Sequence, residues 1–173
     1  MMDTRTKFGL SVLLWAMAVT AVLAFENHLP AGITYMSSPS LPEGWYVTRP
    51  ISFPLRRGET VCAVYHQPAW AAGRHYLPNG SFICKHVFGL PGDRIEMRHR
   101  VVHICPAGGH KCFFAGRILT HDPQGRPVYA VPLPNRIPAG YVYLGSTRVV
   151  TSFDSRYLGV FPMSDVKLAI RRI

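Results

Sequence analysis

Acidic residues are scarce in this chain of 173 residues: nine Asp and Glu stand against nineteen Lys and Arg. The resulting net charge of +10 would suit a partner such as nucleic acid or anionic lipid. However, the basic residues form no block of five or more, and the densest clusters are the doublets Arg56-Arg57 and Arg171-Arg172. We therefore interpret most of the charge as solvated surface and expect no nucleic-acid partner.

The sequence also lacks internal repeats, low-complexity tracts and a glycine-rich phosphate loop. Gly89 and Gly92 flank a Leu-Pro pair that favours a turn, and we expect no helix after it. We therefore expect no nucleotide or other cofactor. With 48% hydrophobic residues, the chain can form one packed domain in addition to a targeting segment.

Only one long apolar run is present, the uncharged stretch FGLSVLLWAMAVTAVLAF at residues 8–25. A helix of this length spans about 27 Å, which is close to the thickness of the hydrocarbon core of a bilayer. Arg5 and Lys7 precede it, so the positive-inside rule places residues 1–7 in the cytoplasm and residues 26–173 on the other side. A cleavable signal peptide and a buried core helix are the alternatives. The length of the run favours a retained, single-pass anchor.

No long amphipathic helix is predicted after this run, apart from a single turn at residues 69–73. Short segments rich in β-branched and aromatic residues follow instead, separated by prolines and glycines. We predict a mainly β fold, an antiparallel, barrel-like coiled sheet. The expected strands lie at residues 44–48, 60–65, 81–88, 94–97, 100–105, 127–131, 141–144, 148–151 and 166–173.

A serine-rich stretch lies shortly after the apolar run and reads Ser37-Ser38-Pro39-Ser40-Leu41-Pro42. Each proline fixes its own φ and pushes the preceding residue toward an extended conformation. This arrangement can hold the hydroxyl of Ser40 at a set angle. The alternative is an ordinary polar loop.

A lysine interrupts the apolar alternation of residues 81–88. The side chain of Lys85 is predicted to share a strand face with Ile83 and Val87. Burial of an ammonium group is costly and lowers its pKa, so a neutral amine near a serine could act as a general base. A shift of about 3 units would make it largely neutral near pH 7. The alternative is a lysine that protects an edge strand from aggregation.

Polar side chains gather again near the C-terminus, where residues 151–159 contain a carboxylate, a guanidinium and several hydroxyls. Such a run can form a hydrogen-bond network that orients a neighbouring base. The alternative is a polar turn with a weak local ion pair. The residues concerned are Ser152, Asp154, Ser155 and Arg156.

The four cysteines suggest two disulfides, since an even count is typical of exported domains. Cys105 and Cys112 bracket a short loop, and Cys62 and Cys84 lie in neighbouring predicted strands. Zinc is the alternative, because several His and Cys residues lie close together in the sequence, but their spacing fits no compact zinc pattern and export favours oxidation. We therefore expect no metal at His99, His103, Cys105, His110 and Cys112.

Three separated motifs resemble those of the bacterial signal (leader) peptidases, in the same order along the chain. Residues 85–93, KHVFGLPGD, resemble the lysine box, and residues 138–145 with 152–162 resemble the last box. Ser38-Pro39-Ser40-Leu41-Pro42 resembles the nucleophile box, with one residue fewer before the second proline than the usual Ser-Met-x-Pro. Gly145-Ser146-Thr147 replaces the usual Gly-Asp-Asn. The compact form is similar to the TraF branch, the conjugative-transfer peptidases that process pilin in type IV secretion.

The resemblance implies a membrane-anchored serine endopeptidase of the bacterial inner membrane, with its catalytic domain on the periplasmic side. It assigns Ser40 as the nucleophile, Lys85 as the general base, and Ser38 with the Ser40 N–H as the oxyanion hole. Ser152 would hydrogen-bond the lysine amine, and Asp154 and Arg156 would form a supporting ion pair. The rival nucleophiles are Ser37 and Ser155.

The expected partners are a prepilin or another exported precursor protein, and membrane lipid. The removal of a leader or terminal segment, with possible joining of the new pilin ends, is the function that the resemblance implies. Two alternatives stay open. One is a general signal peptidase, and the other is an inactive component of the envelope or of pilus assembly.

Overall fold

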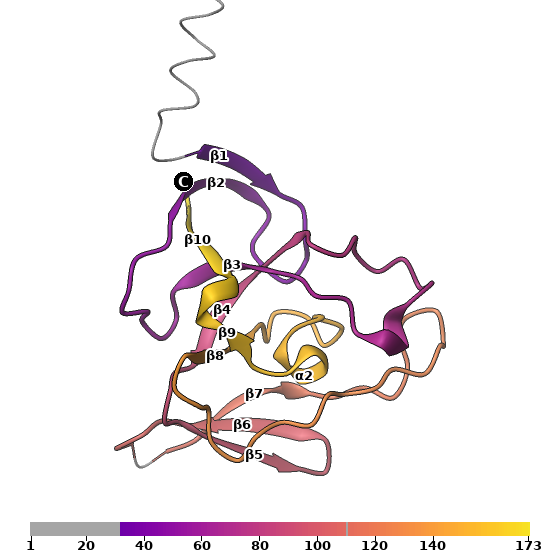
Figure 1. Cartoon of the computed structure of the whole chain (residues 1–173). Coiled ribbons are helices and arrows are strands. Elements are labelled where there is room, and N and C mark those ends of the chain that lie inside the picture. Colours follow the sequence, from indigo (N-terminus) through magenta and orange to yellow (C-terminus); the bar gives the residue numbers. More distant parts are fainter. Residues whose placement is uncertain (1–31, 110) are drawn as a thin grey trace, which may run out of the picture. The chain divides into compact units, whose positions relative to one another are not determined.

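The structure is a computed structural model that describes residues 32–109 and 111–173 (Figure 1). The predicted anchor at residues 8–25 lies outside these ranges, and the division into residues 1–7, 8–25 and 26–173 stays a prediction. Within the described ranges, no helix has the length and apolar character needed to cross a membrane.

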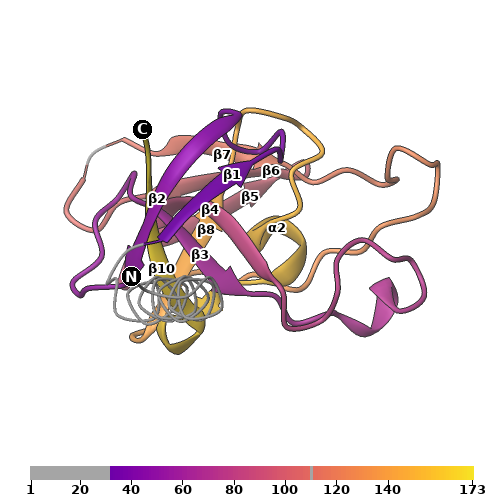
Figure 2. The ribbon, with the colours of Figure 1, turned by 90° about the horizontal axis from the view of Figure 1, so that it is seen from above.

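The described residues form a seven-stranded and a three-stranded sheet (Figures 1 and 2). The larger sheet has the strand order β1-β2-β10-β3-β4-β8-β9 and the smaller β5-β6-β7. The pairings from β2 onward are antiparallel, as predicted. The strands are β1 (Gly32–Met36), β2 (Gly44–Pro50), β3 (Thr60–Val64), β4 (Phe82–Gly89), β5 (Arg94–Arg98), β6 (Val101–Cys105), β7 (Phe113–Arg117), β8 (Tyr141–Gly145), β9 (Phe161–Pro162) and β10 (Val166–Arg172), and the short helices are η1 (Ala69–Ala71), α2 (Ser155–Leu158) and η2 (Met163–Asp165).

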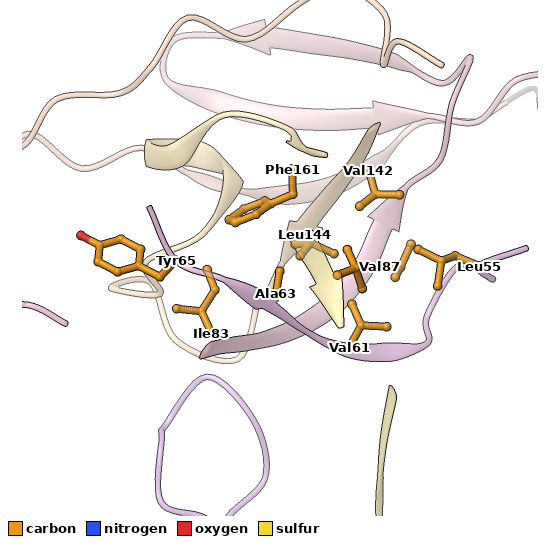
Figure 3. Packing of buried hydrophobic residues seen from close by; sticks show 10 residues of the cluster. Leu55, Val61, Ala63, Tyr65, Ile83, Val87, Val142, Leu144 and Phe161 are labelled. Carbon is orange, nitrogen blue, oxygen red and sulfur yellow. The ribbon is translucent and has the colours of Figure 1, made fainter. Parts of the chain in front are cut away.

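The main core lies on the central strands of the larger sheet. In β4 every second residue is buried, so Ile83 and Val87 point into the core (Figure 3). They pack there with Val61, Ala63 and Leu144 of the neighbouring strands β3 and β8. Because side chains alternate along a strand, Lys85 shares this buried side of β4.

A second core joins the smaller sheet to the rest of the domain. Val102, Ile104 and Ala115 of β6 and β7 pack with Tyr143 of β8 and Tyr157 of α2. The single turn of α2 is thereby held against the smaller sheet. The loop that precedes α2 contains the last group of polar residues singled out in the sequence.

Two disulfides are present, with the pairings expected from the sequence, Cys62–Cys84 and Cys105–Cys112. Cys62 and Cys84 are directly opposed in the β3–β4 pair. Since Cys84 precedes Lys85, the bridge fixes the strand segment that carries the lysine.

Two of the predicted strands are wrong, although most are confirmed to within two residues. Residues 148–151 form a turn, in which the N–H of Ser152 donates to the carbonyl of Val149. Residues 127–131 are irregular, because Pro127 lacks a donor and makes only an isolated bridge with His121. Strands β1, β7 and the two-residue β9 were not predicted, and the expected single turn near residue 69 is η1.

A glycine in β7 leaves room for a buried arginine. Gly116 has a φ of +132°, and a Cβ there would lie 2.6 Å from Nη1 of Arg156. Gly116→Ala should therefore lower the free energy of unfolding by about 3 kcal/mol, through backbone strain and displacement of the guanidinium.

Gly125→Ala is the matched control, because Gly125 has a φ of +77° but a Cβ added there would meet nothing within 4 Å. It should cost about 1 kcal/mol, the strain alone. Urea unfolding followed by tryptophan fluorescence measures both changes. Equal losses would show that Arg156 does not need the space at Gly116.

Candidate active site

A cavity of about 460 Å³ brings together the first two groups of residues singled out in the sequence. Ser38 and Ser40 reach it from the loop between β1 and β2, and Lys85 reaches it from β4. Thr151 and Phe153, from the loop before α2, line another wall. Segments from both ends of the domain therefore meet at one site.

The loop that carries Ser40 is fixed on both sides. The N–H of Leu41 donates to the carbonyl of Ser38 over 3.2 Å, and Pro39 stands at the second position of this turn, where its φ is favourable. Leu41 is buried, and the hydroxyl of Tyr46 donates to the carbonyl of Pro42 over 2.7 Å. Ser40 itself is 6% exposed, so its hydroxyl occupies a defined position in the cavity.

Lys85 is a cation in an apolar environment. It is 5% exposed and stands between Ile83 and Val87 on the buried side of β4. Burial lowers its pKa to about 8, although the nearby Asp154 carboxylate opposes this shift and Arg156 adds to it. The direction agrees with the prediction, and about a tenth of the amines would be neutral at pH 7.

Two serine hydroxyls lie beside the hydroxyl of Ser40. The hydroxyls of Ser38 and Ser152 each lie 3.5 Å from Ser40 Oγ, at the outer limit of a hydrogen bond. The resemblance predicted that Ser152 binds the amine of Lys85, whereas here its hydroxyl donates toward Ser40. Lys85 and Ser40 line the same cavity, but within residues 32–109 and 111–173 no hydrogen bond joins them.

Asp154 and Arg156 form the predicted ion pair, and the pair is fully buried. Two parallel contacts of 2.8 Å join Nε to Oδ1 and Nη2 to Oδ2. The same guanidinium donates to the carbonyls of Ser152 and Arg117, each over 2.9 Å. The pair therefore holds the loop of Ser152 against the end of β7. Loss of one partner would leave a buried charge uncompensated.

Ser146 is a site residue that sequence reasoning noticed only as a departure from the family pattern. Its buried hydroxyl donates to the carbonyl of Ser40 over 2.6 Å. Its N–H donates to Oδ2 of Asp154 over 3.3 Å. Ser146 thus connects the buried ion pair to the backbone of Ser40. The position of Ser146 directly after the buried strand β8 was the feature of the sequence from which a site residue could have been predicted.

Neither rival serine has a geometry suited to attack. Ser155 is fully buried in α2, and its Oγ accepts a hydrogen bond of 2.9 Å from the N–H of Leu144. Ser37 is exposed and does not line the cavity.

The two cysteines among the zinc candidates, Cys105 and Cys112, form a disulfide. Among the described residues, one group has metal-ligand geometry, Glu96 with Cys105 and Cys112. Both of its sulfurs form the disulfide, so they are not available as thiolate ligands. The other bridge, Cys62–Cys84, lines the cavity of Ser40.

Comparisons with known proteins show what the chain is similar to. The family model described as "Signal peptidase, peptidase S26" matches residues 5–171. The "Conjugal transfer protein TraF" of Agrobacterium fabrum strain C58 is 31% identical over 136 residues, which cover 73% of each chain. The crystal structure of a signal peptidase I from Enterococcus faecalis V583 has a TM-score of 0.37 and 18% identity, covering 67% of this chain and 95% of that one. From the family match over nearly its whole length, the chain belongs to the signal peptidase family, peptidase S26.

Proposed function

We propose that this protein is a serine endopeptidase with a Ser40/Lys85 dyad, which removes a leader or terminal segment from an exported precursor protein. The observation that carries the proposal is the shared cavity of Ser40 and a buried lysine whose pKa is lowered to about 8. Membership of a peptidase family supports it.

The chemistry follows from the positions of these groups. The neutral amine of Lys85 takes the proton of Ser40 as Oγ bonds to the scissile carbonyl carbon. The N–H of Ser40 and the hydroxyl of Ser38 stabilise the developing oxyanion, and such donors are typically worth about 2.7–4 kcal/mol each. When the C–N bond breaks, the Lys85 ammonium returns its proton to the departing amine. Water, or a new amino terminus of the substrate, then attacks the ester and releases Ser40.

The proposed substrate is a prepilin-like precursor in conjugative transfer or type IV secretion. The relative named as a conjugal transfer protein supports this choice. A general signal peptidase is the second candidate, and a panel of prepilin and unrelated signal-peptide substrates separates the two. An inactive assembly component would have no use for a buried lysine beside three serines, because its desolvation is costly.

The proposal places the domain on the periplasmic side of the inner membrane, held by the apolar run at residues 8–25. The hydropathy of this run and the basic residues before it support that placement. Recovery of the full chain in the soluble fraction after alkaline extraction of membranes would contradict a retained anchor.

Removal of either member of the dyad should abolish processing. Ser40→Ala and Lys85→Ala should each lower kcat by at least about a thousandfold, because the nucleophile or its base is lost. Cleavage of a prepilin substrate, followed by gel shift and mass spectrometry, measures this loss. Ser37→Ala is the matched control and should retain activity. Continued processing by Ser40→Ala or Lys85→Ala would refute the assignment.

The activity should depend on pH through Lys85. Only the neutral amine can accept a proton, and its pKa is lowered to about 8. Hence kcat/KM should rise about tenfold per pH unit below this value and level off above it. Initial rates between pH 6 and about 10 give the midpoint. A profile that is flat, or that falls as the pH rises through 8, would exclude Lys85 as the base.

Ser146 should act as a positioning residue. Ser146→Ala removes the 2.6 Å hydrogen bond to the carbonyl of Ser40, so the oxyanion donors lose their fixed backbone. We expect kcat to fall about tenfold, equivalent to ~1.4 kcal/mol, with KM and the pH midpoint unchanged. The exposed neighbour Thr147, changed to Ala, is the control. A shifted midpoint in Ser146→Ala would instead indicate an effect on Lys85.

A further inference from the structure

A second cavity, of about 290 Å³, lies beside the cavity of Ser40. The two share three lining residues, Leu77, Thr151 and Phe153. Phe153 directly follows Ser152, whose hydroxyl lies 3.5 Å from that of Ser40. A polypeptide that is extended through the first cavity can therefore reach the second with a side chain located farther along its length.

The walls of the second cavity are mainly apolar and mutually braced. Val128 and Tyr157 line it together with Leu77 and Phe153. The ring of Phe153 contacts those of Tyr76 and Tyr157 at centroid distances of 5.4 and 5.8 Å. Since ring contacts of this kind fix ring orientation, the cavity is formed before a ligand arrives.

The carboxylate at the cavity, that of Asp122, is already paired. Oδ2 of Asp122 accepts from the hydroxyl of Tyr76 over 2.6 Å and from Nε of Arg126 over 2.6 Å. Gln124 adds an exposed, neutral amide. Because Asp122 is paired with Arg126, the two together offer no net charge to a ligand, and His121 completes the polar part of the lining from an exposed position. A volume near the lower end of the range for small ligand sites suits one large side chain.

We propose that the second cavity is a specificity site, which takes one bulky apolar side chain of the precursor at a position away from the cleaved bond. This inference rests on the proposed function, because the same polypeptide must occupy the cavity of Ser40. Burial of a leucine-sized side chain in such a site is expected to tighten binding by about tenfold or more.

The test measures peptide binding to the full-length Ser40→Ala protein in detergent, so that no turnover occurs. The probes are alanine-based dodecapeptides that each carry one leucine, at successive positions, and calorimetry gives their Kd values. We expect a position at which leucine binds about tenfold tighter than alanine. Val128→Trp, which fills the second cavity, should remove that preference and no other.

Two further variants make the test independent of folding damage. Val101→Trp is the matched control, since Val101 is also half-buried but lies in β6 and lines neither cavity. Gln124→Lys should favour glutamate in place of leucine at the same position, and Gln124→Glu should favour lysine. These are gains of selectivity that a misfolded protein would not produce.

The outcomes separate this inference from the proposed function. A positional preference that survives in Val128→Trp, that is lost equally in Val101→Trp, or that is absent altogether would overturn the second site. Cleavage of the same peptides by the protein with Ser40 intact tests the proposed function separately. A failure of cleavage with specific binding retained would reject the peptidase and keep the site.

Discussion

The burial of the Lys85 ammonium is the constraint on which the rest of the domain depends. Removal of a cation from water is costly, and the apolar strand face around it makes the neutral form easier to reach. The Asp154 carboxylate acts in the opposite direction and keeps the pKa near 8 rather than lower. The amine can therefore exist in both protonation states near neutral pH, as the proposed role of Lys85 requires.

The Asp154–Arg156 pair organises the loops around that amine. Buried ion pairs contribute little net stability, and their best-attested value is to fix one arrangement over others. Here the pair contacts Ser146, the loop of Ser152 and the end of β7. Through Ser146 the arrangement reaches the carbonyl of Ser40. The same two groups that act on the pKa of Lys85 therefore also help to position the backbone of Ser40.

The alternation of apolar residues along the strands and the order of the three sequence motifs made much of this structure predictable. The period of two in residues 81–88 identified the buried side of β4, and with it the position of Lys85. The short loop between Cys105 and Cys112, and the neighbouring predicted strands of Cys62 and Cys84, identified both disulfides. Strand β7 was missed because its Ala115-Gly116 pair has weak β propensity. It forms nevertheless because it pairs with β6, and Gly116 leaves room there for the guanidinium of Arg156.

The contacts that could not be predicted are those between distant segments. Ser146 and Ser40 are 106 residues apart, and no local pattern links them. Likewise, residues 127–131 have β propensity, but no described strand offers them a ladder beyond one isolated bridge. The second cavity depends on three separate loops that meet beside Phe153. In each case tertiary packing decides, and its signal is not contained in a short window of sequence.

The tip of the β5–β6 hairpin differs from the rest of the smaller sheet in its backbone conformation. His99 and Arg100 form its two-residue turn with φ values of 48° and 66°, and both are exposed. A type I′ turn built from such residues is strained, so glycine or asparagine would suit it better. Substitution by glycine or asparagine would therefore relax the turn, whereas a longer loop would have to keep the 2.7 Å hydrogen bond that the carbonyl of Arg100 accepts from the N–H of Ile118. Gly116 in β7 does not tolerate a larger residue in this way, because a Cβ there would meet the guanidinium of Arg156.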